Sequence, residues 1–147
     1  MTLNVKKYFL SLTLFAFFLQ LTSCCITKND PPDLKQTAQE FPSTAGVNQS
    51  FTLRFTVQNF SSGECGADRS RNCVVELKMV DRATGHVQVN NFSDMNELDN
   101  NETQQFTFTV TIGTAGTYDL SFIIDPYNTS GDAVRDNNTY TSVVIIN

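Results

Sequence analysis

Cysteine thiols and loop oxygens are the groups in this chain best suited to chemistry. Cys24 and Cys25 follow an apolar N-terminal run, and Cys65 and Cys73 lie further along the chain. Six carboxylates and one amide fall in stretches where Asn, Gly and Asp indicate loops: Asp94, Glu97, Asp99, Asp125, Asn128, Asp132 and Asp136. A thiol can carry a lipid or form a disulfide, and loop oxygens are the ligands that Ca²⁺ takes in extracellular modules.

The N-terminal segment has the layout of an export signal that ends in a cysteine. Lys6 and Lys7 precede an apolar run over residues 8–19, which is short for a membrane span. The sequence Leu21-Thr22-Ser23-Cys24 resembles the bacterial lipobox, which implies that residues 1–23 are removed and that Cys24 is acylated. Such acyl chains anchor a protein stably, at ~0.8 kcal/mol per buried methylene. The alternative is a soluble secreted protein with a chance cysteine at the cleavage point.

The residue after the lipidated cysteine bears on the destination of the protein. Cys25 is not an aspartate, so by resemblance to known sorting rules we expect the outer membrane, with the periplasmic or surface face left open.

Cys65 and Cys73 are then the two cysteines left for a bridge in an exported domain. Closing that short loop would stabilise the fold by roughly 2–3 kcal/mol. His86 is the only histidine, so we expect no zinc site.

Net charge and chain length limit which partners and how many domains are expected. Removal of residues 1–23 takes away two lysines and no acids, which leaves 8 basic and 15 acidic residues and a formal charge of −7. A nucleic-acid partner is therefore not expected. Residues 24–33, with Pro31-Pro32, are predicted to form an extended tether, and residues 34–147 one domain.

Apolar residues alternate with polar ones at a period of two, which predicts β-strands. Phe51, Leu53, Phe55 and Val57 show the pattern most clearly. Strands are expected over residues 34–41, 51–58, 75–79, 85–90, 106–112, 118–124 and 139–146. Seven short strands without a convincing helix predict an all-β fold, an immunoglobulin-like antiparallel β-sandwich. Aromatic residues on the apolar faces, including Phe51, Phe106 and Phe122, are predicted to form its core.

Several short motifs extend this pattern to a family resemblance. The strand over residues 51–59, the turn at residues 115–118, and Asp125-Pro126-Tyr127-Asn128 followed by Asp136-Asn137-Asn138 resemble the CARDB domains, immunoglobulin-like modules named for cell adhesion in bacteria. The resemblance implies a binding or spacing module without catalysis. This chain departs from the pattern in the insertion from Cys65 to Cys73 and in Arg135, where the family is usually acidic, which weakens any transfer of a calcium role.

Motifs of the common enzyme classes are missing from the chain. It has no nucleophile elbow, zinc-protease motif, phosphate-binding loop or dinucleotide fingerprint. Carboxylate pairs such as Glu97 with Asp99 and Asp132 with Asp136 fall in predicted loops, where solvated turns are expected. We therefore expect no enzyme and no organic cofactor, with Ca²⁺ as the one metal that the loops would take.

The predicted topology gathers three long connections at one end of the sandwich. Residues 60–72, 91–103 and 125–138 carry formal charges of 0, −4 and −2, a sum of −6. Such an acidic end is a candidate site for Ca²⁺ or a basic partner, and the alternative is a solvated, solubilising surface. The tether is expected to leave from the same end, so this end could face the membrane.

The sequence favours a lipid-anchored, non-enzymatic module for binding or adhesion in the cell envelope. We expect the membrane as one partner, through the anchor, and an envelope protein or polysaccharide as another. One alternative is a carbohydrate-binding accessory lipoprotein, which needs an exposed aromatic platform that Tyr127 and Tyr140 could supply. Another is a loop-mediated protease inhibitor of immunoglobulin-like fold.

Overall fold

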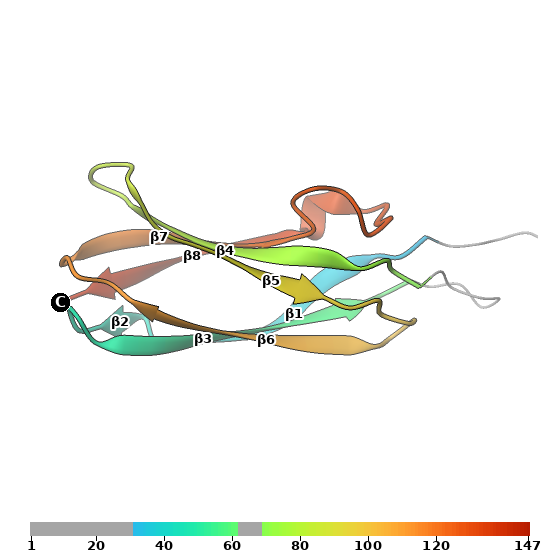
Figure 1. The fold of residues 1–147 in the computed structure, drawn as a ribbon, viewed down its shortest axis with the longest axis horizontal. Coiled ribbons are helices and arrows are strands. Elements are labelled where there is room, and N and C mark those ends of the chain that lie inside the picture. The colour runs from blue at the N-terminus through green and yellow to red at the C-terminus, as the bar shows by residue number, and fades with distance from the viewer. Residues whose placement is uncertain (1–30, 62–68) are drawn as a thin grey trace, which may run out of the picture.

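Strands form in all seven predicted segments. The computed structural model describes residues 31–61 and 69–147, and two β-sheets face each other in it (Figure 1). The strands are β1 (Leu34–Glu40), β2 (Thr44–Ala45), β3 (Ser50–Asn59), β4 (Cys73–Asp81), β5 (Val87–Met95), β6 (Thr103–Thr111), β7 (Gly116–Ile124) and β8 (Thr139–Ile146). A single turn of 3₁₀ helix, η2 (Arg135–Asn137), precedes β8. Within the described ranges, no helix is long and apolar enough to span a membrane.

The strand order is that of an immunoglobulin-like sandwich. Sheet A has the order β1-β3-β6 and sheet B the order β2-β8-β7-β4-β5. Neighbouring strands are antiparallel except for the short β2, which pairs with β8 in parallel. The predicted all-β fold class is confirmed, with the two-residue β2 as an addition that the sequence did not indicate.

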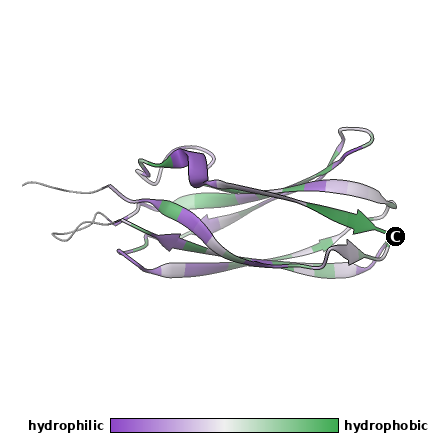
Figure 2. Ribbon diagram, turned by 180° about the vertical axis from the view of Figure 1, so that it is seen from behind, coloured by the Kyte–Doolittle hydropathy of each residue, from purple (hydrophilic) through white to green (hydrophobic). Residues whose placement is uncertain are grey.

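Aromatic rings from both sheets meet at the centre of the core. Phe55 on β3 stacks on Phe122 on β7, with ring centroids 4.2 Å apart and planes 5° from parallel. Phe51, Phe106 and Phe122 are buried, as predicted. Apolar and polar positions alternate along the strands (Figure 2). Because such a ring fills much of the space between the sheets, truncating Phe55 to Ala would cost about 3–5 kcal/mol.

A tyrosine fixes the turn between β6 and β7. Tyr118 is fully buried, and its hydroxyl donates a hydrogen bond of 2.9 Å to the backbone carbonyl of Thr114. Immunoglobulin-like sandwiches use a tyrosine in this way at the corner before the equivalent strand. The contact holds the turn through which the chain passes from sheet A to sheet B, at the end of the molecule that holds the short turns.

β5 is longer than predicted. The sequence indicated a strand over residues 85–90, but pairing with β4 continues to Met95, which lies opposite Cys73. The loop predicted over residues 91–103 is therefore only residues 96–102, and Asp94 lies on a strand. Backbone hydrogen bonds to β4 hold this stretch extended although Asn91, Ser93 and Asp94 have poor strand propensity.

The long connections lie at one end, as the predicted topology requires. Residues 60–61, 69–72, 96–102 and 125–138 lie beside the start of β1, and the short turns lie at the opposite end (Figure 1). We call the described residues of these three connections, together with residues 31–34, the loop end. β1 runs antiparallel to β3 with Leu34 opposite Asn59, so the chain enters the domain here.

Candidate functional site

Buried polar side chains are concentrated at the loop end. In the described part of the chain they are Asn59, Ser61, Ser70, Asp125, Ser130, Asp132 and Asn138. All seven lie in the three long connections or at the end of β3 that leads into one of them. A buried polar group is tolerated when hydrogen bonds replace the lost water, so these residues indicate loops held in defined positions.

Asp125 is the centre of the connection between β7 and β8. One carboxylate oxygen accepts hydrogen bonds from the backbone N–H (2.8 Å) and hydroxyl (3.0 Å) of Thr129. The other accepts from the backbone N–H (3.0 Å) and hydroxyl (2.7 Å) of Ser130. Burial alone would raise the pKa of Asp125, but these hydrogen bonds outweigh burial and lower the pKa below its ordinary value. The carboxylate is therefore ionised and has a structural role.

Arg135 supplies a cation to the same loop. Its guanidinium donates to the backbone carbonyl of Asp125 (2.9 Å), to a carboxylate oxygen of Asp125 (3.4 Å) and to the side-chain oxygen of Asn128. Asp125 and Asn128 both have left-handed backbone, with φ of 49° and 59°, which Asp and Asn tolerate better than most residues. Oxygens predicted to bind Ca²⁺ at these two positions thus contact the guanidinium of Arg135 from the same connection.

Asp132 ties the same loop to the start of the domain. Its carboxylate accepts hydrogen bonds from the backbone N–H groups of Leu34 (3.2 Å) and Val134 (2.9 Å). Burial raises the pKa of Asp132 in spite of these bonds. The backbone N–H of Ala133 also donates to the carbonyl of Pro32 (3.2 Å). The end of the predicted tether is therefore bonded to the domain.

Asn59 joins the tether to the other two connections. Its side-chain oxygen accepts from the backbone N–H groups of Asp33 (3.1 Å) and Ser61 (3.2 Å), and its amide donates to the carbonyl of Leu98 (3.0 Å). Leu98 in turn exchanges two hydrogen bonds with Ser70. One network thus connects the start of β1 with all three long connections.

Arg69 pairs with two carboxylates of the acidic connection. Its guanidinium binds Asp99 through two nitrogens, at 2.6 and 2.8 Å, and Glu97 at 3.0 Å. The hydrogen bonds from Arg69 lower the pKa of Asp99. Because all three side chains are about half exposed, each pair contributes little to stability alone.

The structure distributes the seven predicted oxygen ligands over separate places. Asp125 and Asn128 share Arg135, and Glu97 and Asp99 share Arg69. Of the remaining three, Asp132 bonds to backbone, Asp94 lies on β5, and Asp136 is exposed on η2. Among the described residues, no three His, Cys, Asp or Glu side chains are grouped to hold a metal ion. Calcium binding stays a prediction.

The predicted cysteine chemistry falls mostly outside the described residues. Cys24 and Cys65 both lie there, so lipidation and the bridge between Cys65 and Cys73 stay predictions. Cys73 is buried at the start of β4. Burial, with smaller contributions from Asp125 and Asp132, raises the pKa of its thiol to about 12. If Cys73 is reduced, its thiol is a poor nucleophile at neutral pH.

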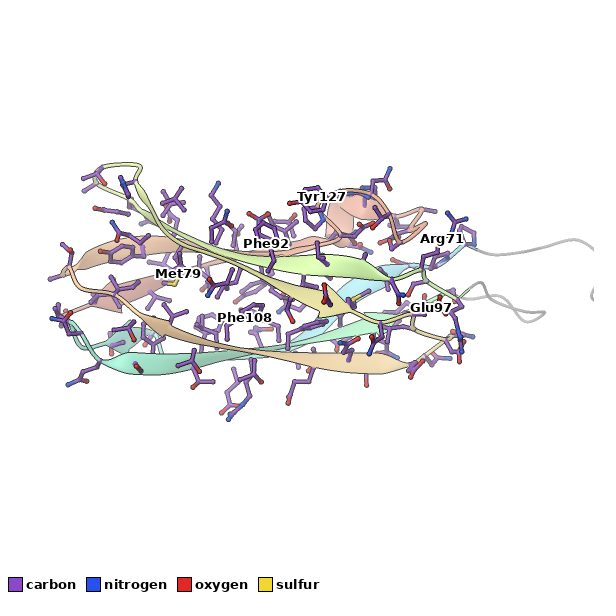
Figure 3. All side chains as sticks on the ribbon, in the orientation of Figure 1. Arg71, Met79, Phe92, Glu97, Phe108 and Tyr127 are labelled. Carbon is purple, nitrogen blue, oxygen red and sulfur yellow. The ribbon has the colours of Figure 1, made fainter. Side chains whose placement is uncertain are left out.

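An exposed aromatic pair lies on the outer side of sheet B. The rings of Phe92 on β5 and Tyr127 after β7 are near parallel, 17° apart, with centroids separated by 6.3 Å (Figure 3). They are 46% and 66% exposed. Tyr140, the other predicted platform residue, instead packs against the rings of Phe41 and Phe55. Phe92 was not among the predicted platform residues, because its strand was expected to end at residue 90.

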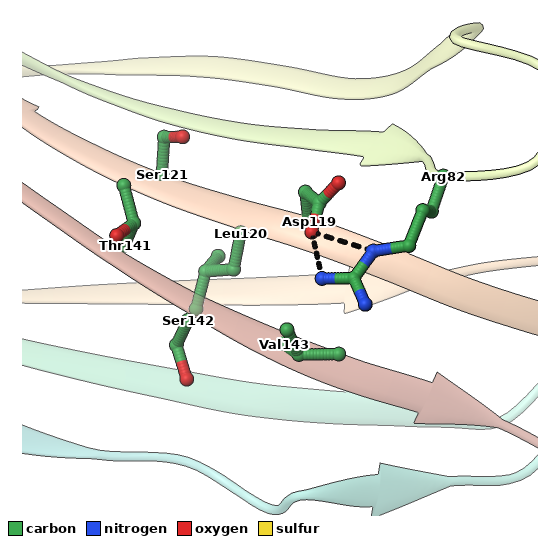
Figure 4. A pocket seen from close by; sticks show the side chains of 7 residues that line it. All are labelled: Arg82, Asp119, Leu120, Ser121, Thr141, Ser142 and Val143. Carbon is green, nitrogen blue, oxygen red and sulfur yellow. Dashed lines mark hydrogen bonds and ion pairs between the residues drawn. The ribbon is translucent and has the colours of Figure 1, made fainter.

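A shallow depression lies on the same sheet, over β7 and β8 (Figure 4). Its volume is about 440 Å³, and Ser121, Thr141 and Val143 line it beside an ion pair of Arg82 with Asp119. Hydroxyl groups of this kind can hydrogen bond to a ligand, but they have no histidine or second carboxylate beside them among the lining residues.

Comparison with known proteins assigns most of the chain to one type of domain. A protein-family model described as CARDB matches residues 31–142. A search of curated proteins finds no match.

Solved structures share the fold. A CARDB domain from Pyrococcus furiosus, solved in complex with di-metal ions, has a TM-score of 0.62 at 22% identity, over 85% of this chain and 97% of that one. A domain of a protein described as a cell surface protein from Methanosarcina acetivorans has a TM-score of 0.58 at 26% identity, over 79% and 92%. A β-glucosidase from Listeria innocua matches with a TM-score of 0.55 at 13% identity, over 78% of this chain but only 16% of the enzyme.

Proposed function

Because the chain belongs to the CARDB family, we propose that it is a lipid-anchored, non-enzymatic binding module of the bacterial cell envelope. The cell surface description of the Methanosarcina acetivorans relative supports an envelope location. The lipobox-like sequence that ends at Cys24 supports an acyl anchor, and the outer membrane is the expected bilayer.

The place where β1 begins is the observation that carries this proposal. Pro32, Asp33 and Leu34 are bonded to the loops at the loop end. The free tether between lipid and domain would then be residues 24–31, which reach no more than about 28 Å when fully extended. An anchored domain would hold its loop end toward the bilayer and its sheet faces and short turns away from it.

This orientation gives the two candidate surfaces different roles. The acidic loop end, with its internal ion pairs and buried hydrogen bonds, connects the domain to its lipid anchor. The outer face of sheet B, with Phe92 and Tyr127, is available to an envelope protein or polysaccharide. Exposed aromatic rings are typical of such contacts because they bury a large area with few rotatable bonds.

Replacement of Cys24 tests the anchor. Cys24→Ala should abolish labelling by a fatty-acid probe and move the protein from the membrane fraction to the soluble fraction. Cys25→Ala is the matched control and should keep both the label and the membrane fraction. Membrane retention of the Cys24→Ala protein would contradict the anchor.

Capture from an envelope extract tests the binding surface. Tyr127→Ala should weaken capture of any partner held by the wild-type protein, whereas Val143→Ala, on the same sheet and also exposed, should not. Equal capture by both variants would exclude the aromatic pair.

Carbohydrate binding is a second candidate, favoured by the Phe92 and Tyr127 stack. Parallel rings offer an apolar face on which a sugar ring can pack, although the chain has no tryptophan. Retention of the protein on insoluble polysaccharides, and its loss in Tyr127→Ala, would support this candidate. Absence of retention on every polysaccharide tried would favour a protein partner.

A further inference from the structure

The two sheets have four edge strands, and three of them carry features that hinder pairing with another chain. β1 has a register shift between Gln36 and Ala38 and carries the charges of Lys35 and Glu40. β2 has only two residues. Pairing along β5 is irregular between Met79 and Val80 on β4, and the Gln104 side chain donates to the backbone carbonyl of Asp94 (3.4 Å). Short edges, charges and bulges are the usual protection against edge-to-edge association.

β6 is the exception. It pairs with β3 through nine consecutive residue pairs without a shift, so its outer edge is regular. The strand, Thr103-Gln104-Gln105-Phe106-Thr107-Phe108-Thr109-Val110-Thr111, contains no charged residue, proline or glycine. It lies on the open side of the sandwich, opposite the free edge of β5 (Figure 1).

The ladder with β3 shows which backbone groups face outward. Asn59 N–H donates to the carbonyl of Glu102 (3.1 Å), and Asn48 N–H donates to the carbonyl of Ile112 (2.8 Å). The even-numbered residues therefore bond to β3, because N–H and C=O of one residue point the same way and alternate along a strand. The N–H and C=O groups of Thr103, Gln105, Thr107, Thr109 and Thr111 point to the open side.

We propose that β6 is a pairing edge for a second copy of this chain, with the two β6 strands antiparallel and centred on Thr107. About Thr107 the sequence of β6 matches itself in the reverse direction at Phe106 with Phe108 and at Thr103 with Thr111, while uncharged Gln105 and Gln104 face Thr109 and Val110. Thr107 would face Thr107 of the second copy, Thr103 would face Thr111, and Phe106 would face Phe108. Threonine and aromatic cross-strand pairs of this kind favour pairing.

The resulting contact satisfies the outward backbone groups. Five residues on each of two strands each donate one N–H, which gives ten hydrogen bonds in a continuous six-stranded sheet. No like charges oppose one another, since β6 has none. The two loop ends would point in opposite directions, so a dimer with both copies anchored would lie with its strands along the bilayer, whereas a single anchored copy would hold its loop end toward it. The pairing does not depend on the lipid anchor, so its failure would leave the proposed function unaffected.

Cysteine cross-linking of the full-length protein in membranes tests the register. Directly opposed residues of a hydrogen-bonded pair have Cα atoms about 5.5 Å apart, within the range of a disulfide. Thr107→Cys should therefore give an oxidised dimer, at least about tenfold more than Thr109→Cys, whose two copies would lie four residues out of register. Gln105→Cys combined with Thr109→Cys should restore the yield. Equal yields from the two single variants would overturn the proposal.

Substitution of the central backbone N–H tests the hydrogen bonds. Proline is tolerated at an edge position whose N–H faces solvent, so Thr107→Pro should keep the fold, as checked by circular dichroism. It should weaken self-association of the full-length protein in detergent by at least about tenfold. Thr107→Val, which keeps the N–H, should associate like the wild type. A wild type that sediments as a monomer at all concentrations, or a Thr107→Val protein as weak as Thr107→Pro, would refute the pairing.

Discussion

Replacement of Asp125 by alanine distinguishes a structural carboxylate from a ligand-binding one. The two carboxylate oxygens accept four hydrogen bonds from Thr129 and Ser130, at 2.7 to 3.0 Å. In Asp125→Ala the two hydroxyl groups can turn to other acceptors, but the two backbone N–H groups cannot. The loss should therefore appear as a large fall in stability without any added ligand.

The size of the effect follows from the burial of the partners. Ser130 is buried, so its unpaired N–H would cost about 1–3 kcal/mol, and the more exposed N–H of Thr129 about 1 kcal/mol. Alanine at φ of 49° adds about 1 kcal/mol, because the left-handed region is unfavourable for a residue with Cβ and no local hydrogen bond. The sum is about 3–5 kcal/mol, a large part of the 5–15 kcal/mol that is typical of a domain.

Urea denaturation followed by circular dichroism measures this difference. Asp125→Ala should lower the midpoint while the dependence on urea stays the same, since the core is unchanged. Asp136→Ala is the matched control. It removes a carboxylate from the same connection, but Asp136 is exposed on η2, so its stability should change by less than about 0.5 kcal/mol. Equal effects of the two substitutions would refute the structural role of Asp125.

The pH dependence gives a second check. The pKa of Asp125 is lowered in the folded state, so its contribution is present above the unfolded pKa, about 3.9, and is lost as pH falls through the folded pKa. The gap between wild type and Asp125→Ala should thus be largest near neutral pH and shrink below about pH 4. Asp132 acts in the opposite sense. Because the pKa of Asp132 is raised in the folded state, its contribution to stability is present below about pH 3.9 and is lost as pH rises. The effect of Asp125 must therefore be taken as the difference in stability between wild type and Asp125→Ala at each pH, and not from the wild-type curve alone.

Three further substitutions test other parts of the structure. Tyr118→Phe removes the hydroxyl bond to Thr114 and should cost about 1 kcal/mol in the same urea assay, and an unchanged midpoint would exclude a stabilising role. If Cys65 and Cys73 are bridged, the purified protein should show no free thiol at either position by mass spectrometry. Cys65→Ser should then lower the free energy of unfolding by roughly 2–3 kcal/mol. Alkylation of both thiols in the wild type would contradict the bridge. Arg135→Ala removes the cation that contacts three oxygens of Asp125 and Asn128. If Ca²⁺ can replace that cation with a dissociation constant of ~10⁻³ M, 1–10 mM Ca²⁺ should stabilise this variant by about 0.4–1.4 kcal/mol and should stabilise the wild type less. A melting temperature of the variant that is indifferent to Ca²⁺ would exclude these oxygens as a calcium site.

The fold was predictable because its strands have one apolar face. Alternation at a period of two identified β3, β6 and β7, and the strand count placed the long connections at one end. The signal was lost in the second half of β5. Asn91 and Ser93 occupy inward-facing positions there, but this strand lies at an open edge of the sandwich, where inward side chains remain partly exposed. Polar residues are tolerated there, and pairing with β4 maintains the strand.

The roles of the carboxylates were not predictable from formal charge. The sum of −6 is correct as a count, but it does not show which oxygens are already bonded. Arg69 lies 28 and 30 residues from Glu97 and Asp99 in the sequence, so the pairing depends on two connections that meet only in the folded domain. Phe92 was missed for a related reason, since its exposure beside Tyr127 depends on the register of β5.

Arg135 shows how one residue can change the role of a loop. A cation with several oxygens around it stabilises a turn whether it is a metal ion or a guanidinium, because both balance the carboxylate and align the carbonyl dipoles. In this chain the guanidinium belongs to the loop itself, so the chain supplies the positive charge that balances Asp125. The same network extends through Asp132 and Asn59 to the start of β1. A domain anchored through that strand would therefore meet its tether at a point held by hydrogen bonds that the chain itself supplies.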